Sequence, residues 1–391
     1  METLKPNILY FGPIGIRGGI GGSARLRNML NALGKMEANT RLISYLPEYK
    51  FKVTHTQPNN YLNTTVISVP ISFPKILKLP ALLQILIYGL RFIRNRDIVF
   101  THSPGIVYGL PALILAKIFR KPLFIDLTDI KDIDTPQFIY DYVLRNSDMV
   151  FTVSRYLEDV AKFAGCRRVV HAPGFIDANI FQKDISERER IRYQLNIGSD
   201  EVAIGYAGAF SPDEGLSFLL KAFKNLSARY KNLKLVFIGG RNAPGTDDIP
   251  ELANELGIKD RVIFVPTLPY ESVPGYLSAL DIACSPKIDR PMNRAADPIR
   301  VYEYMSVGLP VIATAMGETR YAIEDGYDGF LVEPGDEDNL ARVLEYVIQN
   351  LNSLGELKTK AREKVIGNYT QEVIITKLEI NLKRLLSRQG K

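Results

Sequence analysis

The sequence predicts an α/β protein with two Rossmann-like, doubly wound domains that face each other across a cleft. Three observations indicate this class. The chain has 391 residues, which at about 100–200 residues per domain suggests two domains. Short apolar runs alternate with amphipathic stretches along the whole chain, as in parallel sheets covered by helices on both faces. The alternation restarts near residue 200, where a second domain would begin.

In the first half, the apolar runs predict strands, and helical patterns such as 23–36 and 154–163 lie between them. The predicted strands are 8–12, 41–46, 65–69, 98–102, 123–127, 149–153 and 168–171. In the second half, the predicted strands are 202–207, 234–239, 262–265, 282–285, 310–315 and 329–333. A charged stretch precedes the restart, which places a linker between the two halves. We therefore expect domains at 1–175 and 200–370, a linker over 176–199, and a C-terminal helix over 371–391 that would pack back on the first domain.

The cysteine content argues against a disulfide framework or a structural zinc site. Only Cys166 and Cys284 occur, with no CxxC pair, so a reducing, cytoplasmic compartment is expected. No signal-peptide pattern is visible before the first strand, and the uncharged, strongly apolar stretches 79–90 and 103–116 are shorter than the ~20 residues of a spanning helix. A protein that is soluble, or lies on a membrane without crossing it, is expected.

Charge is distributed unevenly. Residues 1–175 carry 22 Lys and Arg against 12 Asp and Glu, whereas residues 176–391 carry 27 against 31. This asymmetry indicates an anionic partner for the first half, such as lipid headgroups, nucleic acid or a phosphorylated ligand. A solvated basic surface is the alternative. A nucleic-acid partner is not expected, because no aromatic-basic motif occurs and the excess charge is spread over many elements.

A glycine-rich loop follows the first strand and precedes a predicted helix. Glycines allow close backbone approach to a ligand, and amides at a helix start favour phosphate. The spacing meets the dinucleotide fingerprint only loosely and no acidic residue ends the second strand, so NAD binding is not expected. A loop without a ligand is the alternative. The residues proposed to approach phosphates or an acceptor are Arg17, Gly18, Gly19, Gly21 and Gly22.

A second element spans residues 293–314, in which a loop with Pro298 leads into a helix and then an apolar strand. Arg300 and Glu303 lie three residues apart on that helix and share a face near its start. A cation there can hold phosphate, and a carboxylate can accept two hydrogen bonds from a diol such as ribose. A plain salt bridge between the two is the alternative.

Here the chain resembles a known family, the retaining glycosyltransferases of family 4. Residues 302–313 and 324–336 are similar to the family's donor-site helix and strand and to the segment after them. Similarity also covers the start of the second domain, at 206–210 and 215–216, and the linker, at 173–177 with Phe181. A strand end in the first domain, 97–104, is similar more loosely.

The resemblance implies a GT-B fold, a nucleotide-sugar co-substrate, UDP- or GDP-linked, held mainly by the second domain, and transfer with retained configuration. It implies no required metal and no further cofactor. Glu303 would bind the ribose and Arg300 would face the diphosphate. Gly208 would belong to the same donor site.

Several positions depart from the family's pattern, and the chain resembles a branch that lacks the first of its paired glutamates. That position is Ala295, and the places of a diphosphate-binding arginine and lysine are taken by Ala209 and Glu214. A glutamate would repel phosphate. Phosphate binding would then fall to Arg300 and other cations. These are Arg241, Arg294 and Arg17.

On the acceptor side, Thr128 stands where the family often has a histidine. A leaving phosphate can take the acceptor proton in front-face retention, so no strong protein base is required. Asp129 and His102 are the candidates to orient the acceptor. Alternatively, Asp129 caps a helix and His102 is hydrogen-bonded in its loop.

The segment 71–96 is apolar almost all round, with cations at its ends. Such a segment can lie in a headgroup region, so membrane contact is a further prediction; a helix that covers the first sheet is the alternative. Together these features predict a glycosyltransferase at the inner face of the cell membrane that acts on a lipid-linked or polysaccharide acceptor. A catalytically inactive binding or scaffold subunit is the second hypothesis, suggested by Ala295, Ala209 and Glu214.

Overall fold

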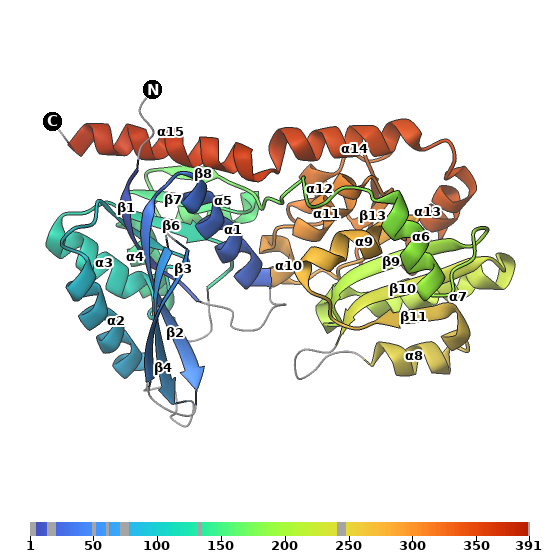
Figure 1. Cartoon of the computed structure of the whole chain (residues 1–391), viewed down its shortest axis with the longest axis horizontal. Helices are drawn as coiled ribbons and strands as arrows, with labels where there is room; N and C mark the ends of the chain where they lie inside the picture. The colour runs from blue at the N-terminus through green and yellow to red at the C-terminus, as the bar shows by residue number, and fades with distance from the viewer. Residues whose placement is uncertain are drawn as a thin grey trace. The chain divides into compact units, whose positions relative to one another are not determined.

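The computed structural model describes residues 5–13, 21–48, 52–59, 62–70, 78–131, 135–240 and 248–389. The chain divides into two compact units (Figure 1). Unit 1 comprises Met1–Gly174 together with Gln371–Lys391, and unit 2 comprises Phe175–Thr370. Each unit contains one sheet with its own helices.

Unit 1 contains an eight-stranded sheet in the order β3-β4-β2-β1-β5-β6-β7-β8. Its strands are β1 (Asn7–Phe11), β2 (Asn39–Glu48), β3 (Lys52–Asn59), β4 (Leu62–Pro70), β5 (Ile98–Thr101), β6 (Leu123–Leu127), β7 (Met149–Thr152) and β8 (Val169–His171). Its helices are α1 (Gly21–Lys35), α2 (Lys78–Phe92), α3 (Gly109–Phe119), α4 (Gln137–Arg145), α5 (Arg155–Phe163) and α15 (Gln371–Gln389). The central strands are apolar and wholly buried, as strands covered on both faces must be.

The sequence did not predict β3, the one antiparallel strand in the described part of the sheet. It pairs with β4 at the sheet's edge. Its sequence, KVTHTQPN, has no apolar run and contains a proline, which edge strands tolerate because one side needs no ladder hydrogen bonds. An apolar-run search finds buried strands and misses a polar edge strand of this kind.

Unit 2 contains a six-stranded parallel sheet in the order β11-β10-β9-β12-β13-β14. Its strands are β9 (Val202–Ala209), β10 (Leu233–Gly240), β11 (Val262–Val265), β12 (Ile282–Ser285), β13 (Val311–Thr314) and β14 (Phe330–Val332). Its α-helices are α6 (Ile185–Gln194), α7 (Leu216–Arg229), α8 (Ile249–Glu255), α9 (Val273–Ser278), α10 (Pro291–Ala295), α11 (Ile299–Val307), α12 (Thr319–Ala322), α13 (Glu337–Asn350) and α14 (Gly355–Asn368). Its short 3-10 helices are η2 (Pro212–Glu214), η3 (Lys259–Arg261) and η4 (Tyr270–Ser272).

The core of unit 2 lies on both faces of this sheet. Ile204 and Tyr206 of β9 pack in one cluster with α7 and α13, whereas Ala203 packs in another with α9, α11 and α14. Successive residues of a strand point to opposite faces, so one apolar strand supplies both clusters. This arrangement explains why the strands read as continuous apolar runs.

The C-terminal helix and the predicted linker, 176–199, both have tertiary contacts. Helix α15 belongs to unit 1 and contacts α1, with Lys35 Nζ 3.2 Å from Glu372 Oε1. The stretch 176–199, which the sequence predicts as a linker, contains α6 and packs within unit 2. Arg188 and Arg192 of α6 form salt bridges with Asp281 at 2.6 and 3.0 Å.

The strand order reverses once in each parallel sheet. In unit 1 the chain leaves β1 for β2 on one side and later returns to β5 on the other. In unit 2 the same reversal separates β9 from β12. Ligands of such sheets bind outside the carboxyl ends of the strands at these switch points, so the two strand ends β1/β5 and β9/β12 are the places to search for a site.

Candidate functional site

A cluster of charged and aromatic side chains lies at the β9/β12 switch point of unit 2. Arg300, in the first turn of α11, donates to both carboxylate oxygens of Glu214, with Nη2 3.1 Å from Oε1. The same guanidinium donates to the hydroxyl of Tyr206 at 3.0 Å and lies 4.8 Å from the centroid of that ring. Three elements distant in sequence, β9, η2 and α11, therefore meet at one charged group.

Lys287 adds a second cation to this cluster. It follows β12, and its ammonium lies 3.7 Å from Glu214 Oε1 and 3.2 Å from Asn293 Oδ1. The Lys287 and Arg300 side chains are each 19% exposed, and that of Glu214 is 13% exposed. Two mostly buried cations therefore share one carboxylate, which leaves a net positive charge.

The pKa values reflect this balance. Burial alone would raise the pKa of the Glu214 carboxyl, but the guanidinium of Arg300 and the ammonium of Lys287 outweigh it, so that this pKa lies below its usual value. Burial lowers the pKa of Lys287, although Glu214 opposes the shift. The carboxylate is therefore charged, and the lysine gains from any additional anion that comes within reach.

Two glycines leave room for the cluster. Gly208 of β9 has a φ of +153°, and a Cβ there would lie 2.8 Å from Arg300 Nη2 and from Tyr206 Oη. Gly239 of β10 has a φ of +133°, and a Cβ there would lie 2.1 Å from the carbonyl oxygen of Gly208. Gly208, predicted to belong to the donor site, thus contacts the guanidinium of Arg300.

The other donor-side predictions fall at different places. Glu303 is half-buried on α11, one turn after Arg300. Arg294 forms a bidentate salt bridge with the exposed Asp289 at 2.6 and 2.7 Å, and Ala295 is buried at the end of α10. Arg241 lies outside the described residues. The structure therefore brings together Arg300 and Gly208, and it adds Lys287, Glu214 and Tyr206.

A second cluster lies at the β1/β5 switch point of unit 1. His102, directly after β5, is 5% exposed, and its Nδ1 lies 3.6 Å from Oδ2 of the wholly buried Asp126. Its Nε2 lies 3.3 Å from the hydroxyl of Thr128, whose oxygen is 3.5 Å from Asp129 Oδ2. The two predicted acceptor-side residues, His102 and Asp129, thus flank Thr128, and Asp129 is exposed.

Arg25 of α1 holds Asp126 in place. Its Nε and Nη2 donate to the two carboxylate oxygens at 3.2 and 2.9 Å, and its Nη1 donates to the carbonyl of Pro173 at 2.9 Å. Burial would raise the pKa of Asp126, but the guanidinium of Arg25, helped by the nearby His102 ring, lowers it to about 2. Asp126 therefore stays charged down to about pH 2, and its carboxylate faces the His102 ring.

The loop residues predicted to approach phosphates are only partly described. Arg17, Gly18 and Gly19 lie outside the described residues, and Gly21 and Gly22 form the first positions of α1. Among the described residues, no group of three or more His, Cys, Asp or Glu side chains could hold a metal ion.

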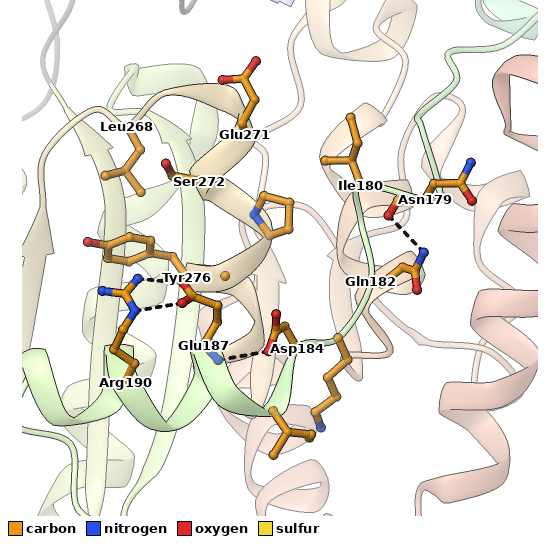
Figure 2. A pocket seen from close by; sticks show the side chains of 14 residues that line it. Asn179, Ile180, Gln182, Asp184, Glu187, Arg190, Leu268, Glu271, Ser272 and Tyr276 are labelled. Carbon is orange, nitrogen blue, oxygen red and sulfur yellow. Dashed lines mark hydrogen bonds and ion pairs between the residues drawn. The ribbon is translucent and has the colours of Figure 1, made fainter.

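A hollow on the surface of unit 2 lies elsewhere. It has a volume of about 790 Å³ and lies among α6, η4 and α9, where Arg190 donates to Glu187 at 2.8 and 2.6 Å (Figure 2). None of Arg300, Glu214, Lys287 and Tyr206 lines it. Arg190 is paired with Glu187, Asp184 accepts from the Glu187 amide and Gln182 donates to the Asn179 carbonyl, so these polar groups already have partners.

Comparison with known proteins finds a family match within unit 2. Residues 187–364 match the family "Glycosyl transferases group 1". This match includes Glu214, Lys287, Arg300 and Glu303. Among similar proteins, a D-inositol 3-phosphate glycosyltransferase of Mycobacterium marinum is 26% identical over 208 residues, which are 52% of this chain and 42% of that protein. A GDP-mannose-dependent alpha-(1-6)-phosphatidylinositol monomannoside mannosyltransferase of Mycolicibacterium smegmatis is 23% identical over 57% of this chain and 59% of its own. The matches thus span about half the length of these relatives.

Solved structures confirm the predicted fold class. Sucrose-phosphate synthase of Thermosynechococcus elongatus superposes with a TM-score of 0.79 at 18% identity, over 98% of this chain and 100% of that one. Anabaena Alr3699/HepE, solved in complex with UDP, superposes with a TM-score of 0.75 at 17% identity, over 97% and 100%. Both units are therefore Rossmann-like α/β domains of the kind found in GT-B glycosyltransferases.

Sequence reasoning missed four residues of these clusters. Lys287 follows a strand with no motif around it, and Tyr206 was noted only as part of a resemblance. Asp126 is an acidic residue inside an apolar strand, and Arg25 lies on the helix after the glycine loop. For Asp126 the sequence did carry a signal, because a charged residue within an apolar, buried strand needs a partner.

Proposed function

We propose that the protein is a glycosyltransferase that moves a sugar from a nucleoside diphosphate, UDP or GDP, to a lipid-linked or polysaccharide acceptor, with retention of configuration and without a metal. The observation that carries this proposal is the cation pair Arg300 and Lys287 at the switch point of the unit that matches the family. Departure of a nucleoside diphosphate builds negative charge on its oxygens, and fixed cations there lower the barrier.

Donor and acceptor would bind to different units. In unit 2, Glu303 would accept hydrogen bonds from the ribose, one helical turn from the cations. In unit 1, Thr128 and His102 would orient the acceptor hydroxyl, since Asp126 holds the ring and Nε2 is directed at Thr128. The leaving phosphate would take the proton. Relatives that act on phosphatidylinositol or inositol phosphate support an acceptor of this general kind.

The test is transfer and donor hydrolysis with UDP-, GDP- and ADP-sugars, wild type against Glu303→Ala. Loss of two hydrogen bonds to a charged acceptor predicts a decrease in kcat/KM of about 10²-fold or more, since each is worth ~1.5–3 kcal/mol. Glu333→Ala, outside the cluster, is the control. Equal turnover by Glu303→Ala and wild type would refute the assignment of this residue, and nuclear magnetic resonance of the first-formed product decides retention.

An inactive binding or scaffold subunit is the alternative, suggested by Ala295, Ala209 and Glu214. The structure weakens one of its grounds, because two cations compensate the charge of Glu214. Calorimetry with UDP and GDP distinguishes the two hypotheses. Micromolar binding supports the transferase, and no binding to either supports the scaffold.

Membrane contact through 71–96 is part of the proposal, at the inner face of the cell membrane. Residues 71–77 lie outside the described part, but α2 exposes Leu83, Ile87 and Leu90 on one face, each about half exposed. Helix α3 packs against α2 and exposes Ile118 at 64%, beside the exposed cations Lys117 and Arg120. Among the described helices, none has both the length and the apolar character needed to cross a bilayer.

An apolar face with adjacent cations suits an anionic lipid surface, where each nearby cation contributes about 1 kcal/mol. The triple variant L83S/I87S/L90S should no longer co-sediment with vesicles of phosphatidylcholine and phosphatidylglycerol. The control variant Ile366→Ser, which changes an exposed isoleucine of unit 2, should still co-sediment. If wild type and triple variant sediment equally, α2 is not the contact.

A further inference from the structure

Glu214 occupies a position at which a negative charge is expected to oppose phosphate binding. In the structure, however, its carboxylate is the common partner of both cations of the cluster. Arg300 contacts both of its oxygens, and Lys287 lies 3.7 Å from one of them. The Glu214 carboxylate is therefore mostly buried and paired with both cations.

The backbone fixes Glu214 at this place. Gly215 has a φ of +67°, and a Cβ there would lie 2.0 Å from the carbonyl oxygen of Pro286, so the turn after Glu214 packs directly on the loop that carries Lys287. The carbonyl of Asp213 accepts hydrogen bonds from the Ile288 amide at 3.2 Å and from Asn293 Nδ2 at 2.8 Å. These contacts hold the backbone segments that carry Glu214 and Lys287 next to each other, and they do not involve the two charged side chains.

Lys287 also has a fixed direction. Its ammonium lies between Glu214 Oε1 and Asn293 Oδ1, and Asn293 is itself fixed because its amide donates to the carbonyls of Asp213 and Ile288 at 2.8 and 2.9 Å. A lysine ammonium has three donors. The mostly buried ammonium of Lys287 lies near one oxygen of Glu214, and Arg300 binds the same carboxylate. The positive charge of Lys287 is therefore only partly neutralised, and an additional anion would stabilise it.

We propose that Lys287 is a diphosphate ligand of this site and that Glu214 is a positioning residue, which holds Lys287 and Arg300 side by side in the geometry that the diphosphate needs. This proposal rests on the proposed function and assigns residues that the sequence motifs do not. The cluster carries two positive charges and one negative, so it attracts a diphosphate, while the carboxylate of Glu214 offsets the repulsion between the two cations.

The proposal and a simple charge argument predict opposite signs for one substitution. If Glu214 acted only by repulsion, Glu214→Gln would strengthen the binding of a diphosphate. If Glu214 positions the cations, the same substitution leaves Arg300 and Lys287 to repel each other and loses the fixed geometry. Binding of the diphosphate then weakens.

The experiment is calorimetry of the full chain with UDP and GDP, and with uridine and guanosine as probes without phosphate. Glu214→Gln and Lys287→Met should each weaken diphosphate binding about tenfold or more, which corresponds to ~1.4 kcal/mol. Binding of the nucleosides should stay unchanged, a result that unfolding of the site would not give. The double variant should lose less than the product of the two single losses, because Glu214 acts through Lys287.

Glu187→Gln is the matched control, since it removes a carboxylate from another arginine pair of unit 2, that with Arg190. It should bind as the wild type does. Tighter or unchanged UDP and GDP binding by Glu214→Gln would overturn the positioning role, and unchanged binding by Lys287→Met would overturn the ligand role even if Glu214→Gln did not fold. If the wild type itself binds neither nucleotide, the proposed function fails instead.

Discussion

At the scale of single residues, the pair Arg25 and Asp126 is the feature with the clearest energetic consequence. Arg25 is 2% exposed and Asp126 is wholly buried, and two hydrogen bonds join them. A buried pair contributes little beyond what apolar residues would, but losing one partner leaves an uncompensated charge that costs about 3–5 kcal/mol. The pair therefore acts mainly as a fixed point that orients His102 next to it.

This pair predicts an acid dependence of stability. The pKa of Asp126 is lowered to about 2 in the folded chain, against about 3.9 in the unfolded chain. Its contribution, roughly 2 kcal/mol, is complete above the unfolded pKa and is lost as the pH falls from about 4 through about 2. Urea unfolding of the wild type should show this loss, and Asp126→Asn, although less stable throughout, should lack it.

Asp141→Asn, in which a half-buried carboxylate on α4 is removed, is the control and should follow the wild type between these pH values. If the free energy of unfolding of the wild type and of Asp126→Asn changed equally with pH, the buried carboxylate would not titrate with the lowered pKa.

The residue scale also shows how far the sequence can predict a site. Arg300 and His102 could be singled out, because each stands at a strand or helix end where parallel sheets bind ligands. Their partners could not. Glu214 is 86 residues from Arg300 in the sequence, and only the folded chain shows that a residue expected to repel phosphate is bound to two cations.

At the scale of elements, the glycine ends of β9 and β10 decide how closely the two strands approach. Gly239 pairs with Gly208 in register, and both have positive φ values. A side chain at either place would collide with the neighbouring backbone or with Arg300. The apolar runs predicted both strands, but the sequence does not reveal that Gly208 and Gly239 allow the close approach of the two strands.

Adjacent glycines of β10 give a matched test of this packing. Gly239→Ala should destabilise unit 2 by roughly 2–4 kcal/mol, because its φ is unfavourable for alanine and its Cβ would lie 2.1 Å from the Gly208 oxygen. Gly240→Ala should change stability by less than about 0.5 kcal/mol, since the nearest atom to its Cβ is Thr267 Oγ1 at 3.6 Å. Native-state hydrogen exchange in β9 and β10 measures both. Equal effects of the two substitutions would contradict the packing argument.

At the scale of the whole molecule, both units place their candidate groups by the same rule. Each parallel sheet reverses its strand order once, and each reversal carries a charged cluster at the carboxyl ends of its strands. The sequence predicted this architecture from the alternation of apolar and amphipathic segments, because burial on both faces forces that pattern. It did not predict β3, which is polar because it lies at an edge.

Hydrogen exchange can test whether the nucleoside diphosphate binds to unit 2, as proposed, and not to unit 1. A nucleoside diphosphate that binds at the cluster of unit 2 should protect the amides around it, in residues 206–215 and 285–303, and stabilise the unit by about 2.7 kcal/mol at a concentration of 100 Kd. The amides of β5 and β6 in unit 1 should exchange as they do without ligand. Hydrogen-exchange mass spectrometry of the full chain with saturating UDP or GDP measures both, and Lys287→Met should reduce the protection at any fixed concentration. Protection of amides in unit 1 alone would refute the donor site proposed in unit 2. Protection in neither unit would favour the hypothesis of an inactive scaffold subunit.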